Sequence, residues 1–308
     1  MEFKGNPEVL ANLWKKKRFM AANDAAHEAI RPALIVLSGS MRGVYGAAQA
    51  LALDWAGLRD VFDWGIGISA GAPTVGYLLA GQMETGLSIY LNECSSSAFI
   101  SMTRALLKGK PVDLDYIASV FRGVTGKPLD QAAARRSRTS YLVGVTHAET
   151  GEPKLIDAKE AKPDMVEAIR ASIAIPGTSR IVEVDGIPAL DGAVACPLPI
   201  RDVVARFRPT DLLIFPNRSE GERRGDFLAL YQRFGTLGLS PAVRRGLANQ
   251  EECFQTELSW LRSQSKTRYA IVWADDAMHA LTQKQEVLNR VAERAQDHFT
   301  QLLREART

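Results

Sequence analysis

Residues 61–79 read VFDWGIGISAGAPTVGYLL and join an apolar strand to a helix through a serine flanked by glycines. The first eight residues predict a strand, and the apolar side chains after Gly71 recur at helical spacing. Between them residues 67–71, GISAG, match the G-x-S-x-G pattern of a nucleophile at a strand-to-helix turn. Small residues at such a turn can also serve packing alone. The stretch therefore predicts an α/β fold with Ser69 as a candidate nucleophile, held where helix N–H groups favour negative charge.

A second polar loop precedes this stretch. Residues 33–37, ALIVL, predict a strand buried on both faces, and residues 38–43, SGSMRG, separate it from the next helical pattern. Consecutive backbone N–H groups in such a loop can form an oxyanion hole for a serine at the neighbouring strand end. The candidate donors are Gly39, Ser40 and Met41, and the residues expected to support the loop and the serine turn are Arg42, Gly43, Gly67 and Gly71. Arg42 is equally well explained as a solvated surface arginine.

The remaining pattern predicts one domain over residues 1–308, with its core at about 33–275. Strand, loop, helix, strand, turn and helix in succession are the opening of a parallel sheet. Further strands are predicted at 141–145, 154–156, 212–215 and 269–273, helices at 7–30, 165–174 and 283–306, and a helical insertion, a candidate lid, at 88–126.

Composition excludes several classes of protein. With 308 residues, 46% hydrophobic and 24% charged, the chain can bury a large core and is not intrinsically disordered. A net charge of +3 with 7% aromatic residues gives little support for nucleic-acid binding. The three cysteines show neither a zinc spacing nor a disulfide framework, and no run of 18 apolar residues occurs. We therefore expect a cytoplasmic protein without a metal or cofactor.

One basic run bears on membrane contact. Residues 14–19 read WKKKRF within the first predicted helix. The run either contacts anionic lipid or forms a solvated helix face. Peripheral contact with a membrane is therefore an open hypothesis.

A serine nucleophile needs a base. The sequence offers four histidines, His27, His147, His279 and His298, of which His147 and His279 are the leading candidates. A carboxylate is the other option, because residues 191–193, DGA, form a turn after the extended stretch 186–190. An Asp-Gly pair taken alone is more often only a turn. With the serine turn and the polar loop, Asp191 becomes the candidate base.

At this point four segments in order resemble motifs of the patatin-like phospholipase family, in particular its bacterial single-domain members, over about residues 33–274. SGSMRG at 38–43 is similar to the family's G-G-G-x-[RK]-G loop, and GISAG at 67–71 to its G-x-S-x-G turn. ASIAIPG at 171–177 and DGA at 191–193 match A-S-x-A-x-P-G and D-G-[GA]. The resemblance implies a three-layer α/β/α fold with a mostly parallel sheet. It also implies a Ser69–Asp191 dyad, without histidine, that cleaves acyl-ester lipids.

The loop departs from the family pattern, because Ser38 and Ser40 stand where two of three glycines are expected. A side chain there is costly if the backbone needs positive φ. Either the loop keeps its shape at a cost, or the oxyanion hole is degraded and the protein is a weak or inactive lipid-binding relative.

Two further alternatives remain. An α/β-hydrolase esterase would place His279 or His298 after Asp191 in a triad, but only one predicted strand precedes the serine strand, too few for that fold. The glycines of residues 65–71 also resemble a dinucleotide-binding turn. That interpretation needs an acidic residue at the end of a second strand, and only Glu84 is near.

Overall fold

The computed structural model describes the chain except for residues 102, 105–111, 178, 223–237, 276–277 and 308. Its centre is a nine-stranded sheet in the order β1-β9-β8-β2-β3-β4-β7-β6, with β5 paired to β4 off this path. The strands are β1 Glu2–Gly5, β2 Pro32–Val36, β3 Trp64–Ile68, β4 Ser140–His147, β5 Pro153–Asp157, β6 Val182–Val184, β7 Ile187–Asp191, β8 Asp211–Phe215 and β9 Arg268–Trp273.

The sheet is parallel in its middle and antiparallel at its edges. Strands β9, β8, β2, β3 and β4 pair in parallel, whereas β1, β5, β6 and β7 are joined by antiparallel pairs. Parallel strands need helical crossovers on the faces of the sheet, and the expected central strands are of this kind. Strand β1 and its antiparallel pairing with β9 were not predicted from the sequence.

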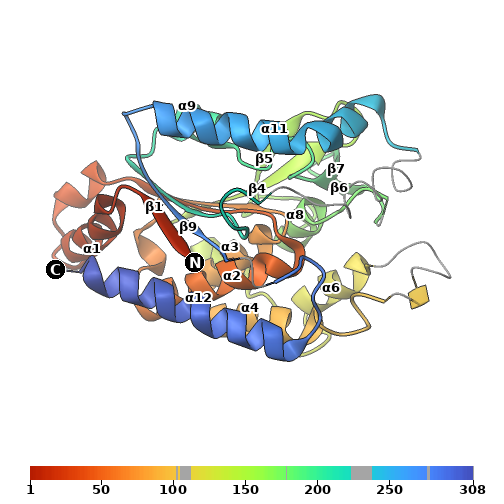
Figure 1. The fold of residues 1–308 in the computed structure, drawn as a ribbon, viewed down its shortest axis with the longest axis horizontal. Helices are drawn as coiled ribbons and strands as arrows, with labels where there is room; N and C mark the ends of the chain where they lie inside the picture. Colours follow the sequence, from red (N-terminus) through yellow and green to blue (C-terminus); the bar gives the residue numbers. More distant parts are fainter. Residues whose placement is uncertain (102, 105–111, 178, 223–237, 276–277, 308) are drawn as a thin grey trace.

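Helices cover both faces of this sheet (Figure 1). They are α1 Glu8–Ala21, α2 Gly43–Trp55, α3 Gly71–Leu79, α4 Met83–Ser88, α6 Leu114–Phe121, α7 Gln131–Arg136, α8 Met165–Ser172, α9 Ile200–Phe207, α11 Pro241–Ser263 and α12 Gln285–Glu305. Short turns of 3-10 helix lie at Ala25–Ala29, Ser40–Arg42 and Arg59–Val61, and a π-helical turn lies at Ile89–Glu93.

Two cores lie on opposite faces of the sheet. Alternate residues of β2 divide between them: Leu34 and Val36 pack with α1, α2, α3, α8 and α12, whereas Ala33 and Ile35 pack with α9 and α11. A strand buried on both faces reads as an unbroken apolar run, which explains the ALIVL segment. The architecture is therefore the expected three-layer α/β/α arrangement (Figure 1).

Two expectations at the N-terminus are wrong. The first helix ends at Ala21 rather than near residue 30, because Asn23 takes a left-handed conformation with φ 52° and Asp24 then caps a separate 3-10 turn. A strand, β1, also pairs with β9 ahead of this helix, so two strands precede β3. The C-terminal helix, Gln285–Glu305, lies close to the predicted 283–306.

Two of the four basic residues of the run in α1, Lys16 and Lys17, form polar contacts within the protein, whereas Lys15 and Arg18 are exposed. Lys16 is 2% exposed and forms an ion pair with Asp63, 2.5 Å away, just before β3. Lys17 donates a hydrogen bond to the Ala56 carbonyl. Burial lowers the pKa of Lys16, and the Asp63 carboxylate opposes that shift. Lys16 therefore has a structural role, and the choice between a solvated face and lipid contact concerns only the exposed residues Lys15 and Arg18.

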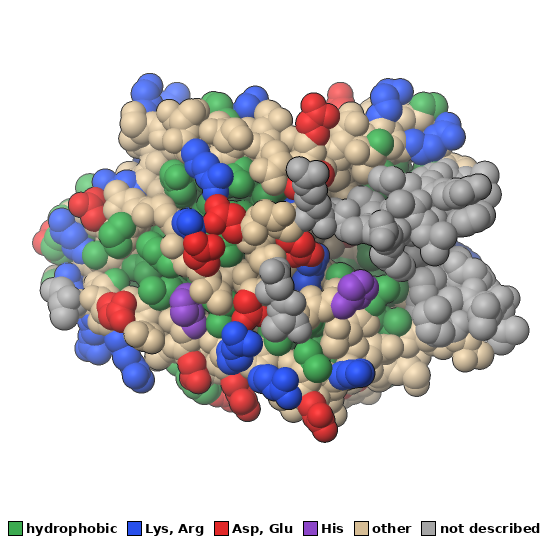
Figure 2. Space-filling model, in the orientation of Figure 1, with side chains coloured by type: hydrophobic (Ala, Val, Ile, Leu, Met, Phe, Trp, Pro, Cys, Tyr) green, Lys and Arg blue, Asp and Glu red, His purple; other side chains and the backbone are tan. Residues whose placement is uncertain are grey.

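The surface shows no separation of charge on the face drawn in Figure 2, where acidic and basic side chains are interspersed along α12. Among the described residues, no helix combines the length and the apolar character needed to cross a bilayer.

Replacement of Lys16 by Met should destabilise the protein by about 1–3 kcal/mol. The substitution keeps the apolar stem but leaves the Asp63 carboxylate without its buried cation. Urea unfolding would measure the loss, with Lys15→Met at the neighbouring exposed position as the control. Equal stability of the two variants would contradict a structural role for the ion pair.

Candidate active site

Ser69 lies in a strained turn between β3 and α3. Its φ is 54°, a left-handed conformation that is uncommon for residues other than glycine. The turn is tight because neighbouring backbone leaves no room: a Cβ on Gly67 would lie 2.4 Å from the Ala72 Cα, and one on Gly71 would lie 1.9 Å from the Val36 carbonyl oxygen. Both glycines are therefore required by packing.

Asp191 faces Ser69 directly. The Ser69 hydroxyl donates to Asp191 Oδ2 at 2.6 Å, and Asp191 Oδ1 accepts from the Ala193 N–H at 2.8 Å. The two side chains are 7% and 5% exposed, so the hydrogen bond lies in a medium of low polarity, where it is stronger than in water. This geometry suits removal of the serine proton by the carboxylate.

Strand β4 brings these residues together although they lie 122 positions apart in the sequence. On one edge of β4, Ile68 pairs with Gly144, and Asp191 pairs with the next residue, Val145. The opposite edge is occupied by β5 over Leu142–Thr146. The C-terminal ends of β3 and β7 therefore meet end to end along one edge of β4.

Ser172, at the end of α8, holds the backbone of this junction. Its Oγ accepts from the Ser69 N–H at 2.9 Å and donates to the Gly144 carbonyl at 2.7 Å, and its side chain is fully buried. The sequence motif at 171–177 includes this serine, but its position alone did not indicate the role. In the same segment, the Ala174 carbonyl accepts a hydrogen bond of 2.9 Å from the Asp191 N–H.

In the polar loop after β2, one of the two serines that replace glycines of the family pattern has a strained backbone conformation. Ser40 has φ 53°, whereas Gly39 is extended at φ −175°. Gly39 is required for a different reason, since a Cβ there would lie 2.7 Å from the Asn217 side chain. Ser40 is thus the position where the side chain disfavours the backbone conformation. Such a conformation costs a folded protein about 1–3 kcal/mol of stability.

One of the three candidate oxyanion donors is already engaged in a hydrogen bond within the protein. The Met41 N–H donates to the Ala280 carbonyl at 3.1 Å, so it is not available to a substrate in this arrangement. In the part of the chain that the structure describes, the N–H groups of Gly39 and Ser40 have no hydrogen-bond acceptor. These two groups are the remaining candidate donors from the loop.

Asn217 binds the backbone on both sides of the loop at residues 38–43. The sequence did not indicate this role. Its side chain donates to the Leu37 carbonyl at 2.7 Å and accepts from the Gly46 N–H at 2.8 Å. Arg42 forms an ion pair with Glu222, which identifies it as an anchored rather than a free cation. Gly43 gives space to the Tyr90 hydroxyl, which a Cβ would meet at 2.5 Å.

The histidines make other contacts. His147 Nδ1 accepts from the N–H groups of Glu149 and Thr150, and His279 Nδ1 accepts from the Leu281 N–H. His27 contacts the Asp24 carbonyl, and His298 lies on α12, where burial lowers its pKa. Among the described residues the Ser69 hydroxyl donates to Asp191 and to no histidine. The geometry thus favours a dyad over the triad alternative.

The glycines of residues 65–71 do not form an open phosphate-binding turn. Gly67 and Gly71 are packed against backbone atoms, and a Cβ on Gly65 would lie 2.8 Å from the Val75 side chain. A dinucleotide site needs glycines that let the diphosphate approach the backbone, so this arrangement disfavours that alternative. In the described part of the chain no group of three or more His, Cys, Asp or Glu side chains is placed to hold a metal ion.

An apolar pocket opens beside Ser69. The space inside it, together with open solvent at its mouth, is about 660 Å³. The wall is formed by Ser40, Met41, Ser69, Ala70, Pro73, Thr74, Tyr77, Gly86, Ile89, Tyr90, Cys94, Phe99, Val112, Leu114, Ile117, Phe121, Ile173 and Ile175. Much of this wall comes from described residues of the insertion predicted at 88–126, of which residues 102 and 105–111 lie outside the described part of the chain.

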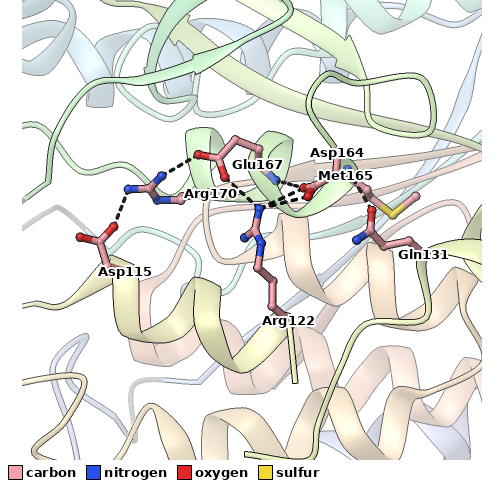
Figure 3. A network of polar contacts seen from close by, with 7 residues as sticks. All are labelled: Asp115, Arg122, Gln131, Asp164, Met165, Glu167 and Arg170. Atoms are coloured by element: carbon pink, nitrogen blue, oxygen red, sulfur yellow. Dashed lines mark hydrogen bonds and ion pairs between the residues drawn. The ribbon is translucent and has the colours of Figure 1, made fainter. Parts of the chain in front are cut away.

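A polar network fixes α6, one wall of this pocket, to α8 (Figure 3). Arg122 donates to Asp164 and Glu167, both at 3.1 Å. Arg170 pairs with Glu167 at 2.6 Å and also with Asp115. The network joins the pocket wall to the helix that carries Ser172.

The family of this chain follows from its sequence profile. Residues 34–204 match the family described as patatin-like phospholipase, so the chain belongs to that family. VipD from Legionella pneumophila is similar in structure, at 12% identity and a TM-score of 0.43, over 89% of this chain and 67% of that one. ExoU of Pseudomonas aeruginosa, solved in complex with SpcU, is similar at 14% identity and a TM-score of 0.34, over 87% of this chain and 60% of that one. No curated protein matches the sequence significantly.

Replacement of Ser172 by Ala should lower kcat about 10- to 100-fold, because the Ser69 N–H and the Gly144 carbonyl would lose their buried partner and the turn would shift. KM should change little. The rate at which a fluorophosphonate labels Ser69 would measure the effect directly.

Thr267→Val is the matched control for this variant. It also removes a buried hydroxyl, but one that lies away from the active site. The Thr267 hydroxyl donates a hydrogen bond of 3.1 Å to the Pro209 carbonyl. If both variants lost labelling rate in proportion to their lost stability, Ser172 would have no specific positioning role.

Proposed function

We propose that this chain is a serine acyl hydrolase of lipid esters, with Ser69 as nucleophile and Asp191 as base. The observation that carries the proposal is the 2.6 Å hydrogen bond between Ser69 Oγ and Asp191 Oδ2 at the wall of an apolar pocket. Membership of the patatin-like phospholipase family supports lipid esters as the class of substrate.

The first half of the reaction forms an acyl-enzyme. Asp191 accepts the Ser69 proton as Oγ attacks the ester carbonyl, and the bond from the carbonyl carbon to the leaving alcohol then breaks. The alcohol takes the proton back from Asp191. The N–H groups of Gly39 and Ser40 stabilise the oxyanion, which bears charge mainly in the transition state.

The second half returns the free enzyme. Water gives its proton to Asp191 and attacks the acyl carbon, and Ser69 leaves with that proton, which releases a fatty acid. The apolar pocket holds the acyl chain throughout and excludes water from its length. No step requires a histidine.

A catalytically weak or inactive lipid-binding protein is the second candidate. The observation in its favour is the φ of 53° at Ser40, together with the Met41 N–H that is already bonded to Ala280. Both features reduce the number of well-aimed oxyanion donors. Turnover of an acyl ester by the purified protein separates the two functions.

Replacement of Ser69 by Ala should lower ester hydrolysis about 10³-fold or more without unfolding the protein. Asp191→Asn should be as damaging, and the double variant no worse than either single one, because the two residues act as a unit. Steady-state hydrolysis of a chromogenic acyl ester measures all three variants. Additive losses, or a collapse of activity in His279→Ala, would contradict the dyad.

Replacement of Ser40 by Gly should maintain or raise kcat, because glycine adopts positive φ without strain. Ser40→Val should lower kcat sharply, since a β-branched residue resists this conformation. The measurement is kcat of folded protein, checked by circular dichroism. A strongly impaired Ser40→Gly variant would show that the serine hydroxyl itself takes part in the site.

A further inference from the structure

The apolar pocket runs along one face of α3, away from Ser69. Its wall includes Ala70, Thr74 and Tyr77, which lie at intervals of four and three residues and so share one helix face. At a rise of 1.5 Å per residue, the distance along the helix from Ala70 to Tyr77 is about 10 Å. The α6 residues Leu114, Ile117 and Phe121 share a face in the same way and also line the pocket.

The far end of the pocket is closed. The rings of Tyr77 and Phe121 are in contact, with centroids 6.0 Å apart. Gly86 packs under them, because a Cβ there would lie 2.8 Å from the Tyr77 Cβ. Tyr77 is 1% exposed and Phe121 3% exposed, so solvent does not reach this end. Among the described residues, Tyr77 and Phe121 therefore close this end of the pocket, and Ser69 lies at the other end.

The closing rings are held in place by polar contacts. The Tyr77 hydroxyl donates to the Lys127 carbonyl at 2.7 Å. Arg122, the residue after Phe121, is bound to Asp164 and Glu167 on α8 (Figure 3). A ring with such anchors does not move aside at low cost to admit a longer chain.

We infer that Tyr77 and Phe121 set an upper limit on acyl-chain length, and that the substrates are esters of one straight, medium-length acyl chain. An extended chain of single bonds advances about 1.2 Å per bond, as an extended backbone does. A depth of about 10 Å then accommodates about eight to ten carbons. This inference rests on the proposed function, because it takes Ser69 as the site of acyl transfer.

The test is a chain-length series. Hydrolysis of p-nitrophenyl esters from butanoyl to hexadecanoyl should show kcat/KM rising about fourfold per methylene up to octanoyl or decanoyl, because each methylene is buried. Beyond that length kcat/KM should fall. Phe121→Ala should raise kcat/KM for dodecanoyl relative to octanoyl esters about tenfold or more, because the end of the pocket opens.

Two further variants make the test specific. Thr74→Met lies one helical turn nearer to Ser69 and should move the optimum to shorter chains. Phe207→Ala removes a phenylalanine from α9 that packs on Trp64, outside the pocket, and should leave the optimum unchanged.

The binding of fatty acids to the Ser69→Ala variant separates this inference from the proposed function. Calorimetric titration with octanoate, decanoate, dodecanoate and hexadecanoate should show the same upper limit, without any chemistry. If fatty-acid binding showed this upper limit on chain length but the wild type hydrolysed no ester, the proposed function would be overturned and the chain-length limit would be supported. Hydrolysis or binding that continues to strengthen to hexadecanoyl, or an optimum that neither Phe121→Ala nor Thr74→Met moves, would overturn the inference.

Discussion

Strands β3 and β7 both pair with the same edge of β4, and the rest of the site depends on this pairing. Ile68 and Asp191 pair with consecutive residues of β4, so backbone hydrogen bonds rather than side-chain contacts fix the distance between nucleophile and base. The junction tolerates no added side chain, because a Cβ on Gly192 would lie 2.2 Å from the Gly144 carbonyl oxygen. Sheet register is rigid, and together with the Ala193 N–H, which binds Asp191 Oδ1, it maintains the 2.6 Å hydrogen bond between the two side chains.

Strain at two serines is balanced by the packing around them. Ser69 and Ser40 both have positive φ. The buried Ser172 side chain binds the Ser69 N–H, and the buried Asn217 side chain binds the Leu37 carbonyl and packs against Gly39, the residue before Ser40. A residue in an uncommon conformation persists only where its surroundings leave it no alternative. The apolar pocket adds to this effect, because a dry site strengthens the hydrogen bonds that hold the turn.

The sequence predicted the elements whose signals are local. Buried parallel strands appear as unbroken apolar runs, and the tight turns at 38–43 and 67–71 appear as small residues between a strand and a helix. Ser69, Asp191 and the loop residues could be singled out in this way, and the resemblance in motifs joined them into one site. The 23-residue helix α11 was not predicted, because its charged and polar face dilutes the apolar pattern. Strand β1 was missed because only pairing with β9 stabilises it.

The sequence alone thus determined the local elements and the candidate site residues. Which distant segments contact each other was decided by the tertiary structure. Ser172 lies 103 positions from Ser69, and nothing in its own neighbourhood indicates that it binds the Ser69 N–H. Cys196 and Cys253 look unrelated in the sequence, yet the fold brings them close enough for their interaction to raise the pKa of Cys196 and lower that of Cys253. The engagement of the Met41 N–H by Ala280 is equally invisible in the chain. The physical reason is that a backbone donor, unlike a hydrophobic side chain, has the same chemistry at every position, so only the fold determines which acceptor it meets.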